Sequence, residues 1–160
     1  MTATIHQLLT SPGHNYFGHH ETPAGTNEII SHESIQLVAG RGIPGDRFFD
    51  WKDNDKGQVT LIDQQLIDDI RRFSGNPELS AGAFRRNVVI EGIDLRSLIG
   101  KTSRLNGLLL EGCEECRRCY WMDKACGKNG TEDLERSRRP PLPNSRRRRT
   151  LPWSRRIPPR

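Results

Sequence analysis

The sequence predicts a mostly β fold, a β-barrel with minor helical decoration. Three observations support this class. Apolar runs have the length of strands, turn-forming residues recur at intervals of about ten residues, and only one segment shows good helical periodicity. A chain of 160 residues is long enough for one domain with a core and too short for two large ones.

The expected strands are short and occur along the whole first part of the chain. One strand starts at Ile5, and residues 34–38 alternate polar and apolar side chains as a half-buried strand does. Residues 59–62 and 87–90 are further strands, the latter β-branched and therefore expected to be buried. Directly after residues 34–38, residues 39–47 form a glycine-dense turn in which the backbone can approach another group closely.

One α-helix is expected after the strand at residues 59–62. Asp63 is well placed to cap it, because a carboxylate can accept hydrogen bonds from free backbone N–H groups of the first turn. Gly75 and Pro77 are expected to end it. The apolar residues that share one helix face are Leu66, Ile67, Ile70 and Phe73.

A helical turn and a hairpin follow the buried strand at residues 87–90. Asp94 is expected to cap a single turn that ends at Gly100. The dipeptide Asn106-Gly107 is a strong hairpin signal, because a type I′ turn needs positive φ at both central residues. It joins predicted strands at residues 101–105 and 108–111.

Charge divides the chain into two regions. Residues 135–160 contain ten Arg, one Glu and six Pro, a charge of +9, which leaves −4 for residues 1–134 because the whole chain carries +5. We expect residues 1–134 to form the domain, and residues 135–160 to be a disordered tail that cannot bury enough apolar surface to order itself.

The composition also bears on location. No stretch approaches the roughly 20 apolar residues that a membrane span requires, and the N-terminus lacks the regions of a signal peptide. We therefore expect a soluble cytoplasmic protein without membrane contact.

Cysteines crowd together directly after the predicted hairpin, at Cys113, Cys116, Cys119 and Cys126. Three interpretations stay open. They could bind zinc, although structural zinc pairs usually have a longer insert, or an iron–sulfur cluster, although Cys126 follows seven residues on and precedes Gly127. Alternatively, one exposed thiolate binds a soft metal or carries sulfur, and Arg117 and Arg118 lower its pKa.

Basic and polar residues before the strand at residues 87–90 suit a phosphate or a pterin edge. Arg85, Arg86 and Asn87 place two guanidinium groups and an amide there, and Arg47 could face an anion next to Asp46. Surface ion pairs would explain the same residues. The histidines of the first loop are expected to be solvated imidazoles rather than metal ligands: His14, His19, His20 and His32.

In this order, the segments resemble the MOSC family, which includes the C-terminal domain of molybdenum cofactor sulfurases, amidoxime-reducing components and small bacterial stand-alone proteins. The resemblance covers about residues 5–130. The segments that carry it are Gly45-Asp46-Arg47, Val59-Thr-Leu-Ile62, Phe84-Arg-Arg-Asn87-Val-Val-Ile90, Asp94-Leu95 with Gly100, and Cys116-Arg-Arg-Cys119-Tyr-Trp-Met-Asp123. The family's β-barrel agrees with the fold class expected above.

The resemblance implies roles for particular residues. Cys119 would be the essential cysteine that ligates molybdenum or carries a persulfide, with Cys116 as its companion thiol and Asp123 as a nearby acid. The residues implied to hold the pterin phosphate are Arg85 and Asn87, with Arg47 and Thr60 as weaker candidates.

Two activities fit the resemblance: reduction of N-hydroxylated compounds at a molybdenum cofactor, and carriage of sulfur in metal–sulfur cofactor assembly. The first needs an external electron donor and the second a cysteine desulfurase. Pyridoxal phosphate is expected only on that separate partner, because this chain has no room for its domain.

The chain departs from the family pattern after Leu134, where further barrel strands are expected and the Arg/Pro-rich residues 135–160 stand instead. We interpret this segment as a frameshift or sequence-error product that leaves the barrel truncated. As a natural tail, it would attract nucleic acid only non-specifically. The alternative function is a cysteine-rich zinc or iron–sulfur module with such a tail, which is not an enzyme.

Overall fold

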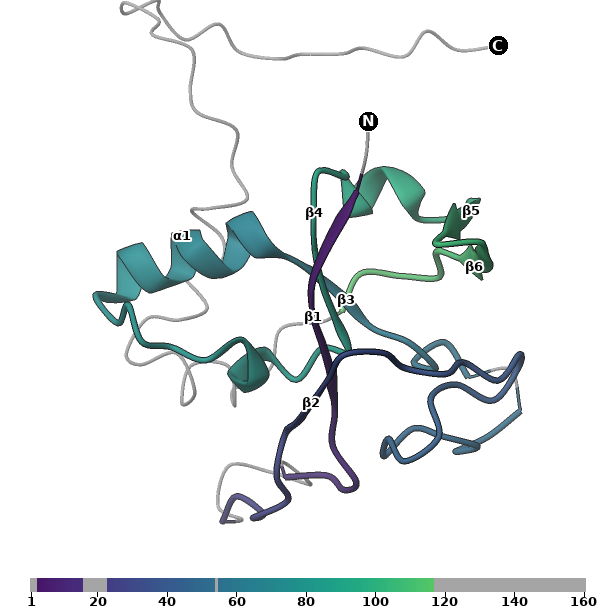
Figure 1. Cartoon of the computed structure of the whole chain (residues 1–160), viewed down its shortest axis with the longest axis horizontal. Coiled ribbons are helices and arrows are strands. Elements are labelled where there is room, and N and C mark those ends of the chain that lie inside the picture. The colour runs from purple at the N-terminus through teal and green to yellow at the C-terminus, as the bar shows by residue number, and fades with distance from the viewer. Residues whose placement is uncertain (1–2, 16–22, 54, 117–160) are drawn as a thin grey trace, which may run out of the picture.

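The computed structural model describes residues 3–15, 23–53 and 55–116. Its central element is a four-stranded mixed sheet in the order β2-β1-β4-β3 (Figure 1). The strands are β1 (Thr4–Thr10), β2 (Ile30–His32), β3 (Leu61–Asp63) and β4 (Val88–Glu91). β1 pairs antiparallel with β2 and β4, whereas β3 and β4 pair in parallel.

The parallel strands β3 and β4 are joined by a crossover that contains helix α1 (Gln64–Ser74) and the 3-10 turn η1 (Ala81–Phe84). The carboxylate of Asp63 accepts a hydrogen bond from the backbone N of Gln65 at 2.9 Å, and Gly75 ends the helix with a φ of 67°. Both predicted helix ends are therefore confirmed.

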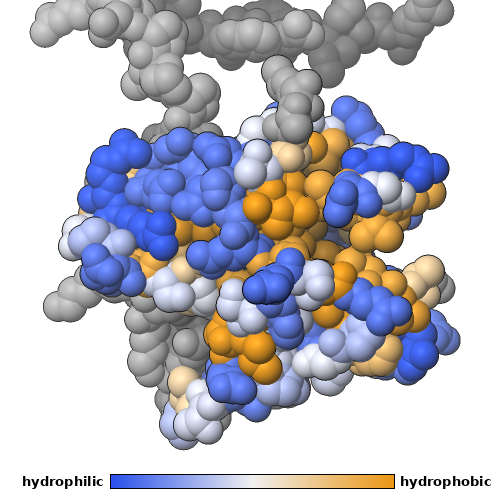
Figure 2. Space-filling model, viewed as in Figure 1, coloured by the Kyte–Doolittle hydropathy of each residue, from blue (hydrophilic) through white to orange (hydrophobic). Residues whose placement is uncertain are grey.

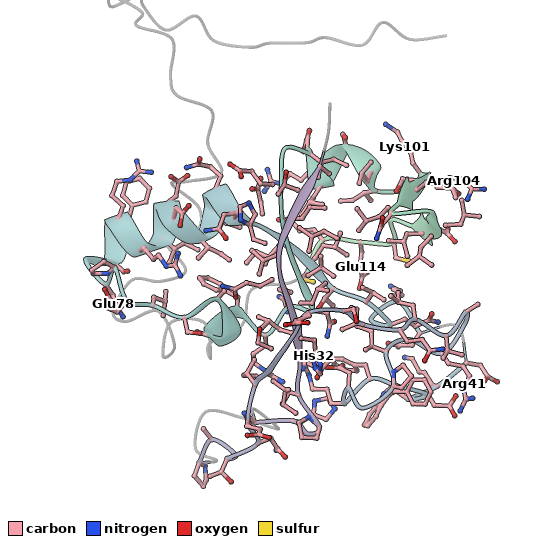
Figure 3. All side chains as sticks on the ribbon, in the orientation of Figure 1. His32, Arg41, Glu78, Lys101, Arg104 and Glu114 are labelled. Carbon is pink, nitrogen blue, oxygen red and sulfur yellow. The ribbon has the colours of Figure 1, made fainter. Side chains whose placement is uncertain are left out.

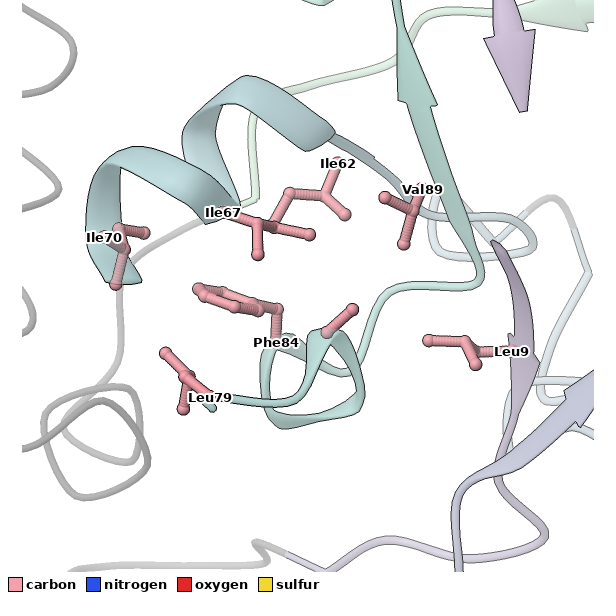
Figure 4. Packing of buried hydrophobic residues seen from close by; sticks show 8 residues of the cluster. Leu9, Ile62, Ile67, Ile70, Leu79, Phe84 and Val89 are labelled. Atoms are coloured by element: carbon pink, nitrogen blue, oxygen red, sulfur yellow. The ribbon is translucent and has the colours of Figure 1, made fainter. Parts of the chain in front are cut away.

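The core lies between α1, η1 and the sheet. Ile67 and Ile70 of α1 are fully buried, and the ring of Phe84 lies between α1 and η1 (Figure 4). Val89 of β4 completes this layer. The predicted helix face is confirmed except at Phe73, which is 46% exposed because it lies outside the stripe that meets the sheet.

A separate hairpin consists of β5 (Thr102–Leu105) and β6 (Leu108–Glu111). Asn106 and Gly107 have φ values of 48° and 84°, as a type I′ turn requires. Before it, the 3-10 turn η2 (Leu95–Leu98) is capped by Asp94, whose carboxylate accepts from the backbone N of Arg96 at 3.0 Å. The predicted turn and hairpin are confirmed.

The β-rich class is confirmed, but the barrel is not. In the described part of the chain, the four-stranded sheet and the hairpin remain two separate sheets that do not close on each other. The segment after β6 runs back from the hairpin toward β3 (Figure 1). Within the same residues, no helix is long and apolar enough to cross a membrane.

The strand predicted at residues 34–38 is wrong. Only Val38 makes an isolated bridge, to Gly42 of the glycine-dense turn, and the strand beside β1 is β2. The backbone N–H groups of Val38, Arg41 and Gly42 donate to carbonyls inside that tight turn. Alternation over five residues is too short a pattern to outweigh this local turn.

Candidate functional site

The glycine-dense turn brings its polar residues close to the sheet. Gly40, Gly42 and Gly45 all have positive φ, and a Cβ on Gly42 would lie 2.9 Å from the backbone oxygen of Gln58. The close backbone approach predicted for this turn is therefore confirmed. As a result, Asp46 lies buried beside the ends of β1 and β4.

The amide of Asn87 is the centre of a buried polar network. Its Nδ2 donates to the backbone oxygen of Leu9 at 3.1 Å and to Oδ1 of Asp46 at 3.2 Å. Its Oδ1 accepts from the backbone N of Thr60 at 3.0 Å and from the Thr60 hydroxyl at 2.8 Å. Asn87 therefore ties β1, the glycine-dense turn and the start of β3 to the start of β4.

Asp46 is a second centre of the same network. Its side chain is 1% exposed, and its two oxygens accept from the backbone N of Ser11 at 3.1 Å and of Phe48 at 3.2 Å. It also forms an ion pair with Arg47, with 3.5 Å between Oδ1 and Nη1. These hydrogen bonds stabilise a carboxylate that would otherwise be costly to bury.

The guanidinium of Arg47 is held from several sides. Its side chain is 4% exposed, its Nη2 donates to the carbonyl of Arg85 at 3.0 Å, and its Cζ lies 4.9 Å from the centre of the Phe48 ring. Burial lowers the pKa of Arg47, and the charge of Asp46 opposes this effect. The buried Nε makes no hydrogen bond within the described residues, so one N–H donor of Arg47 has no acceptor there.

Arg85 has an unusual backbone conformation. It ends η1 in the left-handed region, at φ 56° and ψ 41°, which costs energy for a residue with a Cβ. Its N–H donates to the carbonyl of Gly82 at 2.9 Å, and its own carbonyl accepts from Arg47. The neighbouring elements thus hold Arg85 in this conformation beside a second arginine.

His14 joins this cationic group. Its ring centre lies 5.0 Å from that of Phe48 and 5.3 Å from that of Trp51, both in edge-to-face contacts. Burial lowers the pKa of His14, as do the positive charges of Arg47 and Arg85, whereas Asp46 opposes them. The expectation of a solvated imidazole is therefore wrong for His14, because its half-buried ring lies against the rings of Phe48 and Trp51.

His14 leads to a prediction about pH and stability. Because its pKa is lower in the folded protein than in the unfolded chain, the unfolded chain binds more protons at intermediate pH. The free energy of unfolding should therefore fall as the pH is lowered from about 6.5 through the folded-state pKa. Urea unfolding at a series of pH values should show this slope, and His14→Phe should reduce it.

The matched control for that experiment is His6→Phe. His6 lies in β1, with its Nε2 2.9 Å from Glu91, away from the two arginines. If His14→Phe shows the same pH slope as the unchanged protein, or if only His6→Phe alters it, the assignment to His14 is contradicted.

A cleft of about 480 Å³ lies between the sheet and the hairpin. Its walls come from β3, α1, η2, β6 and the segment after β6; most of their surface is apolar, and charged residues also line them. Figure 2 shows apolar side chains gathered at the centre of one face of the molecule. This volume is in the range of small-molecule sites.

The cleft joins parts of the site that are far apart in sequence. Thr60 of the polar network and Arg86 line it together with Cys113 and Cys116. Cys113 is exposed and Cys116 is half-buried. Of the predicted site residues, Cys116 and Thr60 line this cleft, whereas Arg47, Arg85 and Asn87 do not.

Part of the predicted site lies outside the described residues: Cys119, Asp123 and Cys126. Within the described residues, no group of three His, Cys, Asp or Glu side chains is arranged to hold a metal ion. A ligand set completed by Cys119 therefore stays a prediction.

The four residues predicted to hold a phosphate come together, but with different exposure. Arg47 and Asn87 are buried, whereas Thr60 and Arg85 are half-buried. The hydrogen bonds of the Asn87 side chain are all made within the protein, which suits a positioning role rather than direct contact. His14 was not among the predicted site residues, and Arg86 was indicated only as one of the two arginines before the strand at residues 87–90.

The fold and site define a class: a β-rich domain with a buried carboxylate–amide network that supports clustered cations beside a cysteine-lined cleft. The family model described as MOSC domain matches residues 49–152, more than half of the chain. The chain therefore belongs to the MOSC domain family, which is associated with the molybdenum cofactor. Neither the curated proteins nor the solved structures include a significant match to the chain.

Proposed function

We propose that this protein binds a molybdenum–pterin cofactor, with the cofactor's phosphate at the cation cluster and the metal at Cys119. The observation that carries the proposal is the buried network that gathers Arg47, Thr60 and Asn87, with Arg85 held beside Arg47. Asp46 and Asn87 would position the cations and the Thr60 hydroxyl.

The residues at the cation cluster fit the phosphate of such a cofactor. Arg47 has a buried donor, Nε, without a partner in the described part of the chain, and Arg85 contributes a second guanidinium. Guanidinium groups suit phosphate because they present several donors in a planar fork. The carboxylate of Asp46 accepts from backbone N–H groups and Asn87, and its ion pair with Arg47 is to Nη1, so the Nε donor of Arg47 is left for the phosphate.

Cys116 supports the position of the metal half. It lines the cleft with Thr60, so Cys119, three residues further along the chain, can reach the same region. When bound, the molybdenum would supply the change of oxidation state that removes oxygen from an N-hydroxylated compound. An external donor would supply the electrons.

Sulfur carriage is the second activity that we propose for the same cysteine. The Cys119 thiolate would take the outer sulfur atom from a persulfide on a separate cysteine desulfurase, which would be left with its thiolate. No redox change of the metal is needed in that case. The thiolate of the half-buried Cys116 would then attack the inner sulfur of the Cys119 persulfide, so that a Cys116–Cys119 disulfide forms and the outer sulfur leaves as hydrosulfide.

Cofactor analysis of the full chain tests the proposal. Protein purified from cells that make the cofactor should contain molybdenum and release a fluorescent pterin on oxidation. Arg85→Gln should lower the retained pterin about tenfold, since it removes one charge-assisted contact. One equivalent of zinc without any pterin would reject the proposal in favour of the metal-binding module.

Arg41→Gln is the matched control. Arg41 lies in the glycine-dense turn but at its outer end (Figure 3), paired with Asp50 through two hydrogen bonds, of which that from Nε to Oδ1 is 2.9 Å. Retained pterin should be unchanged in this variant. Equal losses in the two variants would contradict the role of Arg85.

A further inference from the structure

The neighbouring residues Arg85 and Arg86 lie in different surroundings. Arg85 lies near Arg47 and His14, and it does not line the cleft. Arg86 lines the cleft, next to Phe84. Between η1 and β4, the backbone of Arg85 is left-handed, and Arg86 follows it directly.

Three cations line the cleft, and two of them are already paired. The Nζ of Lys56 lies 2.8 Å from Glu114, and Nη2 of Arg96 lies 3.2 Å from Glu115. Glu114 lies between the hairpin and the sheet (Figure 3). Arg86 forms no ion pair within the described residues, and its one hydrogen bond there is a long one, 3.5 Å, to the carbonyl of Arg85.

The carboxylates that α1 and η2 contribute to the cleft are also engaged. Asp63 accepts from the first turn of α1, and Asp94 accepts from the first turn of η2. Asp69 is paired with Arg72 on the surface of α1. Glu111 of β6 also lines the cleft. Within the described residues, none of these four carboxylates pairs with Arg86, so the positive charge of Arg86 remains available to a ligand.

The apolar part of the cleft wall makes up most of its surface. Its side chains come from four elements: Ile62 of β3, Leu66 of α1, Leu98 of η2 and Leu110 of β6. Ile99, which follows η2, also lines the cleft and is 41% exposed. An apolar body could replace water on this wall, which is the usual source of small-molecule affinity.

We propose that this cleft binds a small molecule with an apolar body and a single carboxylate, and that Arg86 binds the carboxylate. A guanidinium that is half-buried and unpaired is a stronger anion site than a surface lysine, because less water competes for its donors. The apolar body would lie on Leu98, Leu110 and Phe84. This site is separate from the phosphate site at Arg47 and Arg85.

The cleft also contains Cys116 and Thr60, so a molecule bound there would lie next to the proposed cofactor. The interpretation of this ligand as the substrate rests on the proposed function. Binding itself does not, because it depends only on residues of the cleft. If the protein contains no molybdenum but still binds the carboxylate, the interpretation of the ligand as a substrate is refuted and the binding site at Arg86 is retained.

Ligand-observed NMR titration of the full chain tests the proposal with phenylpropionate, its neutral amide and acetate. Phenylpropionate should bind at least about tenfold more tightly than the amide, which lacks the charge, and than acetate, which lacks the apolar body. Arg86→Gln should reduce the preference for the carboxylate over the amide to near one, and Arg86→Lys should restore part of it.

Arg96→Gln is the matched control, because it removes the same charge from a cleft residue that is already paired with Glu115. It should retain the preference for the carboxylate. The proposal is overturned if the carboxylate and the amide bind the unchanged protein equally, if acetate binds as tightly as phenylpropionate, or if Arg96→Gln loses the preference as Arg86→Gln does.

Discussion

Replacing Asn87 with leucine is expected to lower the free energy of unfolding by about 3–5 kcal/mol. The change leaves the carbonyl of Leu9, Oδ1 of Asp46 and the N–H of Thr60 without their amide partner in a buried region. Each unsatisfied buried group costs about 1–3 kcal/mol, and relaxation recovers part of the sum. Urea unfolding followed by circular dichroism measures the effect.

The matched variant is Asn76→Leu, since Asn76 is exposed just after α1. It should change the free energy of unfolding by no more than about 0.5 kcal/mol. A cost below about 1 kcal/mol at Asn87 would mean that the network does not join the three segments as the structure indicates.

Local signals predicted the elements whose determinants lie within a few residues. Asp63 and Gly75 define the two ends of α1, and Asn106-Gly107 defines the hairpin, because capping and turn geometry depend on adjacent backbone groups. The strand at residues 34–38 failed because pairing with β1 is decided by distant backbone groups, and β2 provides them instead.

The sequence indicated which polar residues gather around Asn87 better than it indicated how they are arranged. The motif around Asn87 correctly indicated a polar cluster, but sequence spacing does not say which side chain is turned inward. β4 is buried over Val88, Val89 and Ile90, so the amide at its start is enclosed and becomes a support for its neighbours. His14 was not recognised for a similar reason. Its ring contacts Phe48 and Trp51, which follow the glycine-dense turn and are distant from His14 in the sequence.

The start of β4 thus connects the two proposed binding regions. Arg85 belongs to the cation group with Arg47, whereas Arg86 lines the cleft with Cys116. Thr60 takes part in both, through its hydrogen bonds to Asn87 and its position on the cleft wall. A cofactor and a second ligand could therefore occupy adjacent places and meet near the cysteine segment.

Replacing Cys119 with serine is expected to lower the molybdenum content per mole of protein more than about tenfold. A thiolate is a soft, anionic ligand at neutral pH, whereas a serine hydroxyl keeps its proton and is a poor ligand for such a metal. Cys113→Ser and Cys126→Ser are controls with the same atomic change in the same segment. Inductively coupled plasma mass spectrometry of the four proteins measures the difference.

The pterin content of the same samples separates the two halves of the site. Because the phosphate is expected at Arg47 and Arg85, Cys119→Ser should lose metal more completely than pterin, whereas Arg85→Gln should lose both together. If Cys119→Ser keeps its molybdenum and Cys126→Ser loses it, the ligand has been misassigned within the segment. If none of the four proteins contains molybdenum, but Cys119 of the unchanged protein is the one cysteine that gains a sulfur atom from a desulfurase, the protein is a sulfur carrier.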